Sequence, residues 1–278
     1  MDFLSEFLSI ILTFVLSLEL IHIAAGSLVG FVIGLTGVGG GSLMTPILVL
    51  GFGISPAIAV GTDLLYAALT KASGVFFHHR QKTVDWRIVG LLAVGSVPSS
   101  LLTVALLEQI KAAGFNSDRL MMLTLSVMLI LTSFIILIKG HIVSYVSHRH
   151  GESRAVRVLK AYRPHITALS GAILGVLVTI SSVGAGAIGS AILFLLYPHK
   201  KPLSIVGTDI AHAVPLTAIA GMGHVHMGSV DYDLLIGLLC GGIPAIYLGS
   251  LVGRHIPDHW LKGVIACLLF GMGVKLAL

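Results

Sequence analysis

The sequence predicts an all-α integral membrane protein built from two inverted-topology repeats, each with four or five helical segments. Of its 278 residues, 56% are hydrophobic and only 10% are charged, whereas a soluble domain carries about 25% charged residues. Apolar stretches of about 20 residues recur along the chain, which is the length that a helix needs to cross a bilayer. These stretches are continuous rather than alternating in polarity, so the pattern of a β-barrel is not met.

The second observation is an internal repeat. Residues 26–53 read GSLVGFVIGLTGVGGGSLMTPILVLGFG, and residues 171–198 read GAILGVLVTISSVGAGAIGSAILFLLYP. Later in each half, PAIAVGTD at 56–63 matches PLSIVGTD at 202–209. Two related halves that each contain a glycine-interrupted apolar segment are typical of secondary transporters. We therefore divide the chain into an N-terminal apolar extension (1–19), a first transmembrane repeat (20–140), a basic linker (141–165) and a second transmembrane repeat (166–278).

The individual helices follow from apolar runs and their breakers. A helix over 20–35 is interrupted by TGVGGGS at 36–42, because glycine destabilises a helix by up to about 1 kcal/mol per residue. Proline fits the first turn of a helix, so Pro56 is expected to start one. The first half is predicted to contain helices over 20–35, 43–52, 56–78, 86–107 and 116–138. The second half repeats this plan over 166–181, 187–197, 202–223, 232–253 and 259–277.

The positive charges give an independent indication of the inverted topology. Each half is expected to cross the membrane an odd number of times, so the second half enters from the opposite face. Loops rich in Lys and Arg stay in the cytoplasm, and the linker 141–165 is therefore expected to be cytoplasmic in a multi-pass protein of the inner or plasma membrane. One face collects most of the 17 Lys and Arg residues: Arg80, Lys82, Arg87, Lys139, Arg149, Arg154, Arg157, Lys160, Arg163, Lys200, Lys201, Arg254 and Lys262. The other face has Lys111, Arg119 and Lys275, and Lys71 falls inside a helix.

Several other function classes find no support in the residues. The net charge of +5 lies in loops beside apolar helices, where membrane topology explains it better than nucleic acid does. The chain has no Ser/His/Asp arrangement, HExxH or GxSxG, so we expect neither an enzyme nor a cofactor. The HxH pairs at 148–150 and 224–226 lack the spacing of a zinc site, and we interpret them as solvated or interfacial. Within residues 1–19, the mainly apolar stretch FLSIILTFVLSL has only 12 residues between Glu6 and Glu19, which leaves open whether this extension crosses the membrane.

The two glycine breaks are the first candidate binding site. Broken backbone at membrane depth is tolerated only where protein or a water-filled cavity satisfies its polar groups. A helix that begins after such a break directs free N–H groups and the positive end of its dipole at the gap, which suits an anion. Close packing of small residues is the alternative interpretation. The expected substrate-binding residues are Thr36, Gly39, Gly40, Gly41 and Ser42 in the first break, and Ser181, Ser182, Gly184, Ala185, Gly186 and Ala187 in the second.

The repeated Gly-Thr-Asp sequence is the second candidate. Asp63 and Asp209 lie seven residues into their predicted helices, and an ionisable group at that depth is a functional-site hypothesis by default. With Thr62 and Thr208 they are candidates for proton coupling. The alternatives are a carboxylate that pairs with a lysine or histidine, or one that holds a broken helix end.

Three further side chains lie close to these aspartates in the sequence. Lys71 could bind an anion or neutralise Asp63. Tyr66 and His212 each follow an aspartate by three residues, and both can donate a hydrogen bond into the same region. His212 could also form a proton relay with Asp209. We therefore add Lys71, Tyr66 and His212 to the substrate-binding set.

The sequence also resembles a known family. The segments LVGFVIGLTGVGGGSLMTPIL and PAIAVGTDLLYAALTKASGVFFHHRQKTVDWRIVGLLAVGSVPSSLL, followed by a weaker copy of both, are similar to the TauE/SafE sulfite exporter family, also called TSUP or DUF81. The resemblance covers nearly the whole chain after the N-terminal extension. It implies an inner-membrane carrier for a small sulfur-containing anion such as sulfite, sulfate, thiosulfate or an organosulfonate. Many members have a neutral residue where this chain has Asp63 and Asp209, so the anion and the coupling stay open.

Two other functions remain as alternatives at this point. A divalent-metal or cation permease would use Asp63, Asp209, His212 and His224. A non-transporting membrane assembly protein would not need the intramembrane Asp and Lys, so their presence counts against it. The partners expected from the sequence are the anion, protons as a candidate coupling ion and membrane lipids, and the oligomeric state is not predicted.

Overall fold

The computed structural model describes residues 6, 20–36, 41–115, 117–148, 154–253 and 258–278, and over them the chain forms helices and no strand. The all-α prediction is confirmed. The first half contains α2 (Leu20–Thr36), α3 (Gly41–Phe52), α4 (Pro56–Arg80), α5 (Trp86–Ala112) and α6 (Ser117–His148). The second half contains α7 (Arg154–Ser181), α8 (Ala187–Leu196), α9 (Pro202–His226), α10 (Tyr232–Gly253) and α11 (Asp258–Ala277).

Six of these helices are long and apolar enough to cross a membrane, which confirms the prediction of an integral membrane protein. They are α5, α9, the part of α6 over Ser117–Gly140, the part of α7 over Tyr162–Ser181, the part of α10 over Tyr232–Val252 and the part of α11 over Trp260–Ala277. α2, α3 and α8 contain shorter apolar helices. Large apolar side chains such as Val94 and Leu102 are exposed on the outside of the bundle, where lipid rather than water is their natural solvent.

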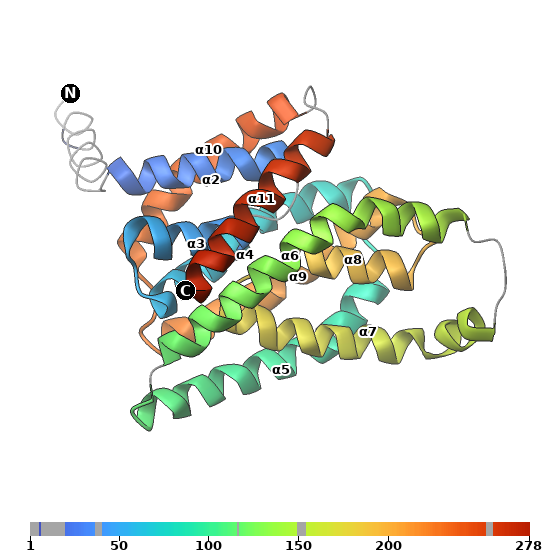
Figure 1. Cartoon of the computed structure of the whole chain (residues 1–278), viewed down its shortest axis with the longest axis horizontal. Coiled ribbons are helices and arrows are strands. Elements are labelled where there is room, and N and C mark those ends of the chain that lie inside the picture. The colour runs from blue at the N-terminus through green and yellow to red at the C-terminus, as the bar shows by residue number, and fades with distance from the viewer. Residues whose placement is uncertain (1–5, 7–19, 37–40, 116, 149–153, 254–257) are drawn as a thin grey trace.

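Corresponding helices of the two halves make reciprocal contacts. α2 packs along α10 at one edge of the molecule, and α7, its counterpart in the second half, packs along α5 at the opposite edge (Figure 1). α4 packs on its counterpart α9, and α6 on its counterpart α11. Such an exchange of partners is what a pseudo-twofold relation between two intertwined repeats requires. The inverted orientation of the halves in a membrane stays a prediction.

Glycines bring the edge helices together. A Cβ added to Gly26 or Gly30 in α2 would meet the backbone of α10, and one added to Gly171 or Gly175 in α7 would meet the backbone of α5. Contacts of this kind let two helix backbones approach closely without side chains between them. Packing of small residues therefore explains the glycines within α2 and α7, whereas the breaks that follow these helices need a different explanation.

This packing predicts a large effect of bulk at one glycine. We expect Gly30→Leu to reduce the yield and unfolding temperature of the folded protein, because the new Cβ would overlap the backbone of Gly242 and only separation of α2 from α10 would relieve it. Gly271→Leu is the matched control, since a Cβ at that position meets nothing within 4 Å. Thermal unfolding of both variants in detergent, followed by size-exclusion chromatography, would check this. Equal unfolding temperatures would contradict it.

Two helices extend into the predicted linker. α6 continues to His148, and α7 already begins at Arg154, so the polar stretch over 139–165 is helical over most of its described residues. Hydropathy predicts where an apolar span ends, but a helix can continue beyond that point through charged residues such as Arg and Lys, which have high helix propensity. The cytoplasmic location of this linker stays a prediction.

Candidate functional site

The second glycine break has a backbone that glycine makes possible. α7 ends at Ser181 and α8 begins at Ala187. Between them, φ is +122° at Gly184 and +130° at Gly186, a region that residues with a side chain rarely adopt. The same segment contains Ser182 at φ +58°. The two glycines are therefore required by the conformation of the break itself.

The start of α8 presents free backbone donors. Gly189 and Ser190 donate their N–H groups to the carbonyls of Gly184 and Gly186. In the described part of the chain, the N–H groups of Ala187 and Ile188 form no such bond. Free N–H groups at a helix start, together with the helix dipole, favour a negative charge in front of them.

The serines of the break differ in their availability. The Ser181 hydroxyl donates to the Leu177 carbonyl at 2.7 Å and accepts from the Val183 N–H at 3.2 Å, so it is already used by the local backbone. The Ser182 hydroxyl is buried and has no hydrogen-bond partner among the described residues. Of the two hydroxyls, only that of Ser182 is available to a ligand.

The first break is described only at its two ends. Thr36 is the last residue of α2 and Gly41 the first of α3, and Ser42 is buried beside it. The predicted binding residues Gly39 and Gly40 lie outside the described residues. The two breaks occupy equivalent places in the order of the helices, as the repeat predicted.

Asp63 lies in the interior of the helix bundle, on α4. Its side chain is fully buried, and its Oδ2 accepts a hydrogen bond from the Thr45 hydroxyl of α3 at 2.5 Å. Its Oδ1 has no partner in the described structure, and Ser182 of the second break is a close neighbour of the carboxylate. The aspartate of the first repeat is therefore placed beside the glycine break of the second.

Lys71 connects α4 to the same break. Its Nζ donates to the carbonyl of Ala185 at 3.2 Å, so the ammonium group lies within the unwound segment that precedes α8. Both Asp63 and Asp209 are close enough to interact with it electrostatically. The two roles expected for Lys71, anion ligand and counter-ion, therefore remain compatible with one position.

Asp209 on α9 faces the start of α8. It is almost fully buried, its Oδ1 has no hydrogen-bond partner in the described structure, and a Cβ added to Gly189 would contact this oxygen. Lys71 and Lys139 are the cations that act on it. Gly189 of α8 therefore lies directly against the Asp209 carboxylate.

Lys139 is a site residue that sequence reasoning missed. We counted it among the loop charges, but it lies within α6, where its Nζ donates to the Ser190 hydroxyl at 2.7 Å and lies 5.2 Å from the centre of the Phe194 ring. Ser190 in turn donates to the Gly186 carbonyl. In the sequence, Lys139 stands directly before Gly140 at the end of an apolar run, and nothing there distinguishes it from a lysine in a loop.

The two threonines of the Gly-Thr-Asp sequences make a reciprocal pair of contacts. The Thr62 hydroxyl of the first half accepts from the backbone N–H of Asp231 in the second half, at 3.1 Å. The Thr208 hydroxyl of the second half accepts from the N–H of Asp85 in the first half, at 2.9 Å. Each threonine thus anchors the start of the long helix of the other half, α10 or α5. Asp85 and Asp231 stand in similar sequences, Val84-Asp85-Trp86 and Val230-Asp231-Tyr232, so this part of the repeat is explained by the two contacts.

The remaining predicted residues have more local partners. The Tyr66 hydroxyl lies against Gly242 of α10 and has no hydrogen-bond partner in the described structure. His212 Nε2 pairs with the Ser96 hydroxyl of α5 at 2.9 Å, and its Nδ1 is unpartnered. The structure therefore places His212 in the core beside α5 and provides no hydrogen bond for the expected relay to Asp209.

The interpretation of His224 as interfacial is wrong. Its ring is fully buried, and its Nε2 is 3.0 Å from the Thr179 carbonyl. A helix turns by about 100° per residue, so the two histidines of an HxH pair point to different sides, and His226 is instead exposed near Glu108. Within the described ranges, no group of three or more His, Cys, Asp or Glu residues could hold a metal ion.

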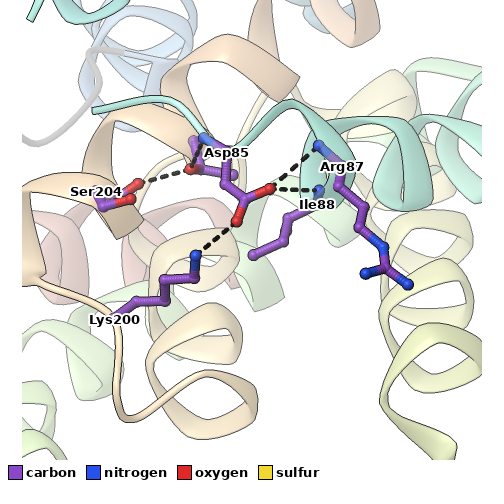
Figure 2. A network of polar contacts seen from close by, with 6 residues as sticks. Asp85, Arg87, Ile88, Lys200 and Ser204 are labelled. Atoms are coloured by element: carbon purple, nitrogen blue, oxygen red, sulfur yellow. Dashed lines mark hydrogen bonds and ion pairs between the residues drawn. The ribbon is translucent and has the colours of Figure 1, made fainter. Parts of the chain in front are cut away.

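A polar network fixes the loop between α4 and α5 to the second half (Figure 2). Asp85 caps α5 by accepting from the N–H groups of Arg87 and Ile88, at 3.1 and 3.3 Å. Its other oxygen forms an ion pair with Lys200 at 2.8 Å. Partial burial raises the pKa of Asp85, but the hydrogen bond and charge of Lys200 and the two N–H donors outweigh it, so the pKa lies below its ordinary value of 3.8.

This network predicts separable losses of stability. Asp85→Asn keeps an N-cap acceptor and loses only the ion pair, which for an exposed pair is worth about 0–1 kcal/mol. Asp85→Ala also loses the cap and is expected to unfold more easily than Asp85→Asn by about 1 kcal/mol. Because the pKa of Asp85 is lowered by folding, its contribution is present above pH 3.8 and is lost as the pH falls below that value. Chemical unfolding in detergent at neutral and acidic pH would check both; equal stability of the two variants would exclude the capping role.

The chain is similar in sequence to a known family of membrane transporters and to several probable membrane transporter proteins. A family model described as sulfite exporter TauE/SafE matches residues 22–276. The chain is 35% identical over 254 residues to the probable membrane transporter protein YjnA of Bacillus subtilis, which covers 91% of this chain and 98% of that protein. It is 29% identical over 246 residues to the probable membrane transporter protein YdhB of the same organism, covering 86% and 91%. A probable membrane transporter protein of Methanocaldococcus jannaschii is 27% identical over 284 residues, covering 95% and 97%. No solved structure matches the chain.

Proposed function

We propose that this chain, which belongs to the sulfite exporter TauE/SafE family of membrane transporters, carries a small sulfur-containing anion across the inner membrane by alternating access. The observation that carries the proposal is the position of Lys71, whose ammonium group reaches the second glycine break at Ala185. A cation and a helix start with free N–H groups therefore meet at membrane depth. Each of them favours an anion, and an intramembrane lysine is rare unless it has such a role.

The proposed ligand groups fit a compact oxyanion. The N–H groups of Ala187 and Ile188, the unpartnered hydroxyl of Ser182 and the ammonium group of Lys71 are the donors on the second break. Sulfite, sulfate, thiosulfate and the sulfonate group all carry several acceptor oxygens around one sulfur atom. Charged acceptors form hydrogen bonds about twice as strong as neutral ones. The first break, over 36–42, is proposed to supply matching donors from the other repeat.

Asp63 and Asp209 are proposed to couple transport to protons. Each is buried with one oxygen unpartnered, and a buried carboxylate in this state is costly unless a cation or a proton compensates it. Lys71 lies in reach of both, so it can compensate the charge of one aspartate at a time when no substrate is present. Proton uptake by an aspartate would release Lys71 to bind the anion, which links the two events.

Thr62 and Thr208 are proposed to have a structural role in the transport cycle. Thr62 and Thr208 hold the starts of α10 and α5 across the interface between the halves. Rocking of one repeat against the other would have to stretch or exchange these two contacts. We therefore propose that they guide the movement of the adjacent aspartates and do not themselves carry protons.

The cation-permease alternative loses support from the same geometry. His212 and His224, which it requires as ligands, are bonded through Nε2 to Ser96 and to the Thr179 carbonyl. Two lysines act on Asp209, and their charge would repel a metal ion. The anion function is the one that these neighbours favour.

Counterflow in proteoliposomes tests the proposal. Purified protein is reconstituted with internal sulfite, and uptake of labelled sulfite is measured with sulfate, thiosulfate and a sulfonate as external competitors. We expect saturable exchange that at least one competitor blocks. If correctly inserted protein exchanges none of these anions, the anion function is wrong, and uptake of divalent cations should be measured in the same vesicles.

A further inference from the structure

A basic cavity lies away from the glycine breaks, between the start of α5 and the start of the apolar span of α7. Here a cavity of about 310 Å³ is lined by Arg87, Arg163, Lys200, Asp85 and Tyr197 together with apolar side chains. It shares no lining residue with the substrate site proposed above. Its chemistry is also different, because all of its charges belong to side chains, whereas the proposed substrate site combines Lys71 with the free N–H groups of a helix start.

The charges of the cavity are not balanced. Asp85 is the single acidic residue among its lining residues, and its carboxylate is already committed to Lys200 and to the N–H groups of Arg87 and Ile88. Arg87 and Arg163 therefore line the cavity with no carboxylate of the cavity left for them. Such a pair of arginines suits a ligand with a planar or tetrahedral array of anionic oxygens.

Arg163 is held in place with a donor unused. Its guanidinium carbon lies 5.7 Å from the centre of the Tyr197 ring, and the Tyr197 hydroxyl is fixed by Thr167 at 2.9 Å. Its Nε is buried and has no hydrogen-bond partner in the part of the chain that the structure describes. A buried N–H of a charged group without an acceptor is costly. A ligand that brings an acceptor would give the Arg163 Nε–H the hydrogen bond that it lacks.

The position of the cavity along the helices indicates the membrane surface. α5 begins at Trp86, and the apolar span of α7 begins at Tyr162; both rings are more than half exposed. Tryptophan and tyrosine gather at the level of the lipid headgroups. A basic pocket between transmembrane helices at this level is suited to the phosphate of a lipid headgroup.

We propose that this cavity binds a phosphate group, with Arg163 and Arg87 as its ligands and the Asp85–Lys200 pair as its wall. The phosphate can be presented by an anionic phospholipid at the surface of the bilayer or by inorganic phosphate from solution. Because the Lys200 ion pair joins the loop before α5 to the loop before α9, a bound phosphate would also hold the two halves together at this face.

The test uses purified full-length protein in a neutral detergent and two probes. Binding of phosphatidylglycerol is measured by native mass spectrometry against phosphatidylcholine, and binding of inorganic phosphate by the shift of the unfolding temperature. We expect Arg163→Gln and Arg87→Gln each to weaken binding by about tenfold, as for the loss of one charge-assisted contact. Lys201→Gln is the matched control, because Lys201 is an exposed neighbour of Lys200 that is not among the residues lining the cavity; it should bind as the unmodified protein does.

The two probes distinguish a lipid headgroup from free phosphate. Phosphatidylglycerol binding that both arginine variants weaken, with no effect of inorganic phosphate, supports a lipid site; a parallel effect of inorganic phosphate supports a site for the free ion. Arg87 is exposed, so Arg87→Gln tests the proposal even if Arg163→Gln fails to fold. If neither probe binds, or if Lys201→Gln weakens binding as much as the arginine variants do, the site is overturned.

Discussion

Asp209→Asn is expected to abolish uphill anion flux driven by a pH gradient while the amount of folded protein stays near normal. Asparagine has almost the shape of the protonated aspartate, so the contact with Gly189 survives. The substitution removes the charge that acts on Lys71 and Lys139 and leaves a group that cannot take up or release a proton. Coupling should be lost, whereas exchange of anion for anion without a gradient should remain measurable.

The same measurement on Asp63→Asn separates the two aspartates. The Thr45 hydroxyl that donates to Asp63 at 2.5 Å can donate equally well to an amide oxygen, so this variant should also fold. Asp233→Asn is the matched control, since Asp233 is an exposed carboxylate in the first turn of α10. Flux in proteoliposomes is measured with and without a pH gradient. If both Asp63→Asn and Asp209→Asn keep the pH dependence of the unmodified protein, the coupling role is wrong.

Much of the fold was predictable because its determinants are local. The length of the apolar runs sets the spans, and Pro56 and Pro202 mark the starts of α4 and α9 where the structure has them. The second break was predictable for a similar reason, since Gly184 and Gly186 adopt backbone angles that other residues rarely accept. The repeat in the sequence then predicted which helices correspond, and their contacts follow that correspondence.

What the sequence did not predict depends on contacts between distant segments. Nothing near Lys71 in the chain indicates that its ammonium group reaches Ala185, because that contact crosses from one half to the other. Lys139 was missed because a lysine at the end of an apolar run can extend to water or turn inward, and only the position of α8 and its Ser190 hydroxyl decides between them. The burial of His224 likewise depends on the approach of Thr179 in α7.

A bulky group introduced at Ala185 after folding is expected to block transport. Ala185 is buried and its carbonyl accepts from Lys71, so a side chain added here would occupy the space in front of α8 where the anion is proposed to bind. Direct substitution by leucine could simply prevent folding. Ala185→Cys avoids this, because cysteine is small and bulk can be attached to it later. The exposed Cys240 and Cys267 are first replaced by serine.

The reagent can itself report on the site. A methanethiosulfonate that carries an ethylsulfonate group resembles the proposed substrate class and enlarges the side chain when it reacts. We expect it to modify Ala185→Cys, to reduce sulfite counterflow to background, and to react more slowly when sulfite is present, because substrate and reagent compete for one space. Gly90→Cys is the control: a Cβ at Gly90 meets nothing within 4 Å, so its modification should leave transport unchanged and sulfite should not protect it. Two results would contradict this prediction: full transport by the modified Ala185→Cys variant, or a labelling rate that sulfite does not alter. Either result would mean that the substrate does not bind at the second glycine break and that the contact of Lys71 with Ala185 is purely structural.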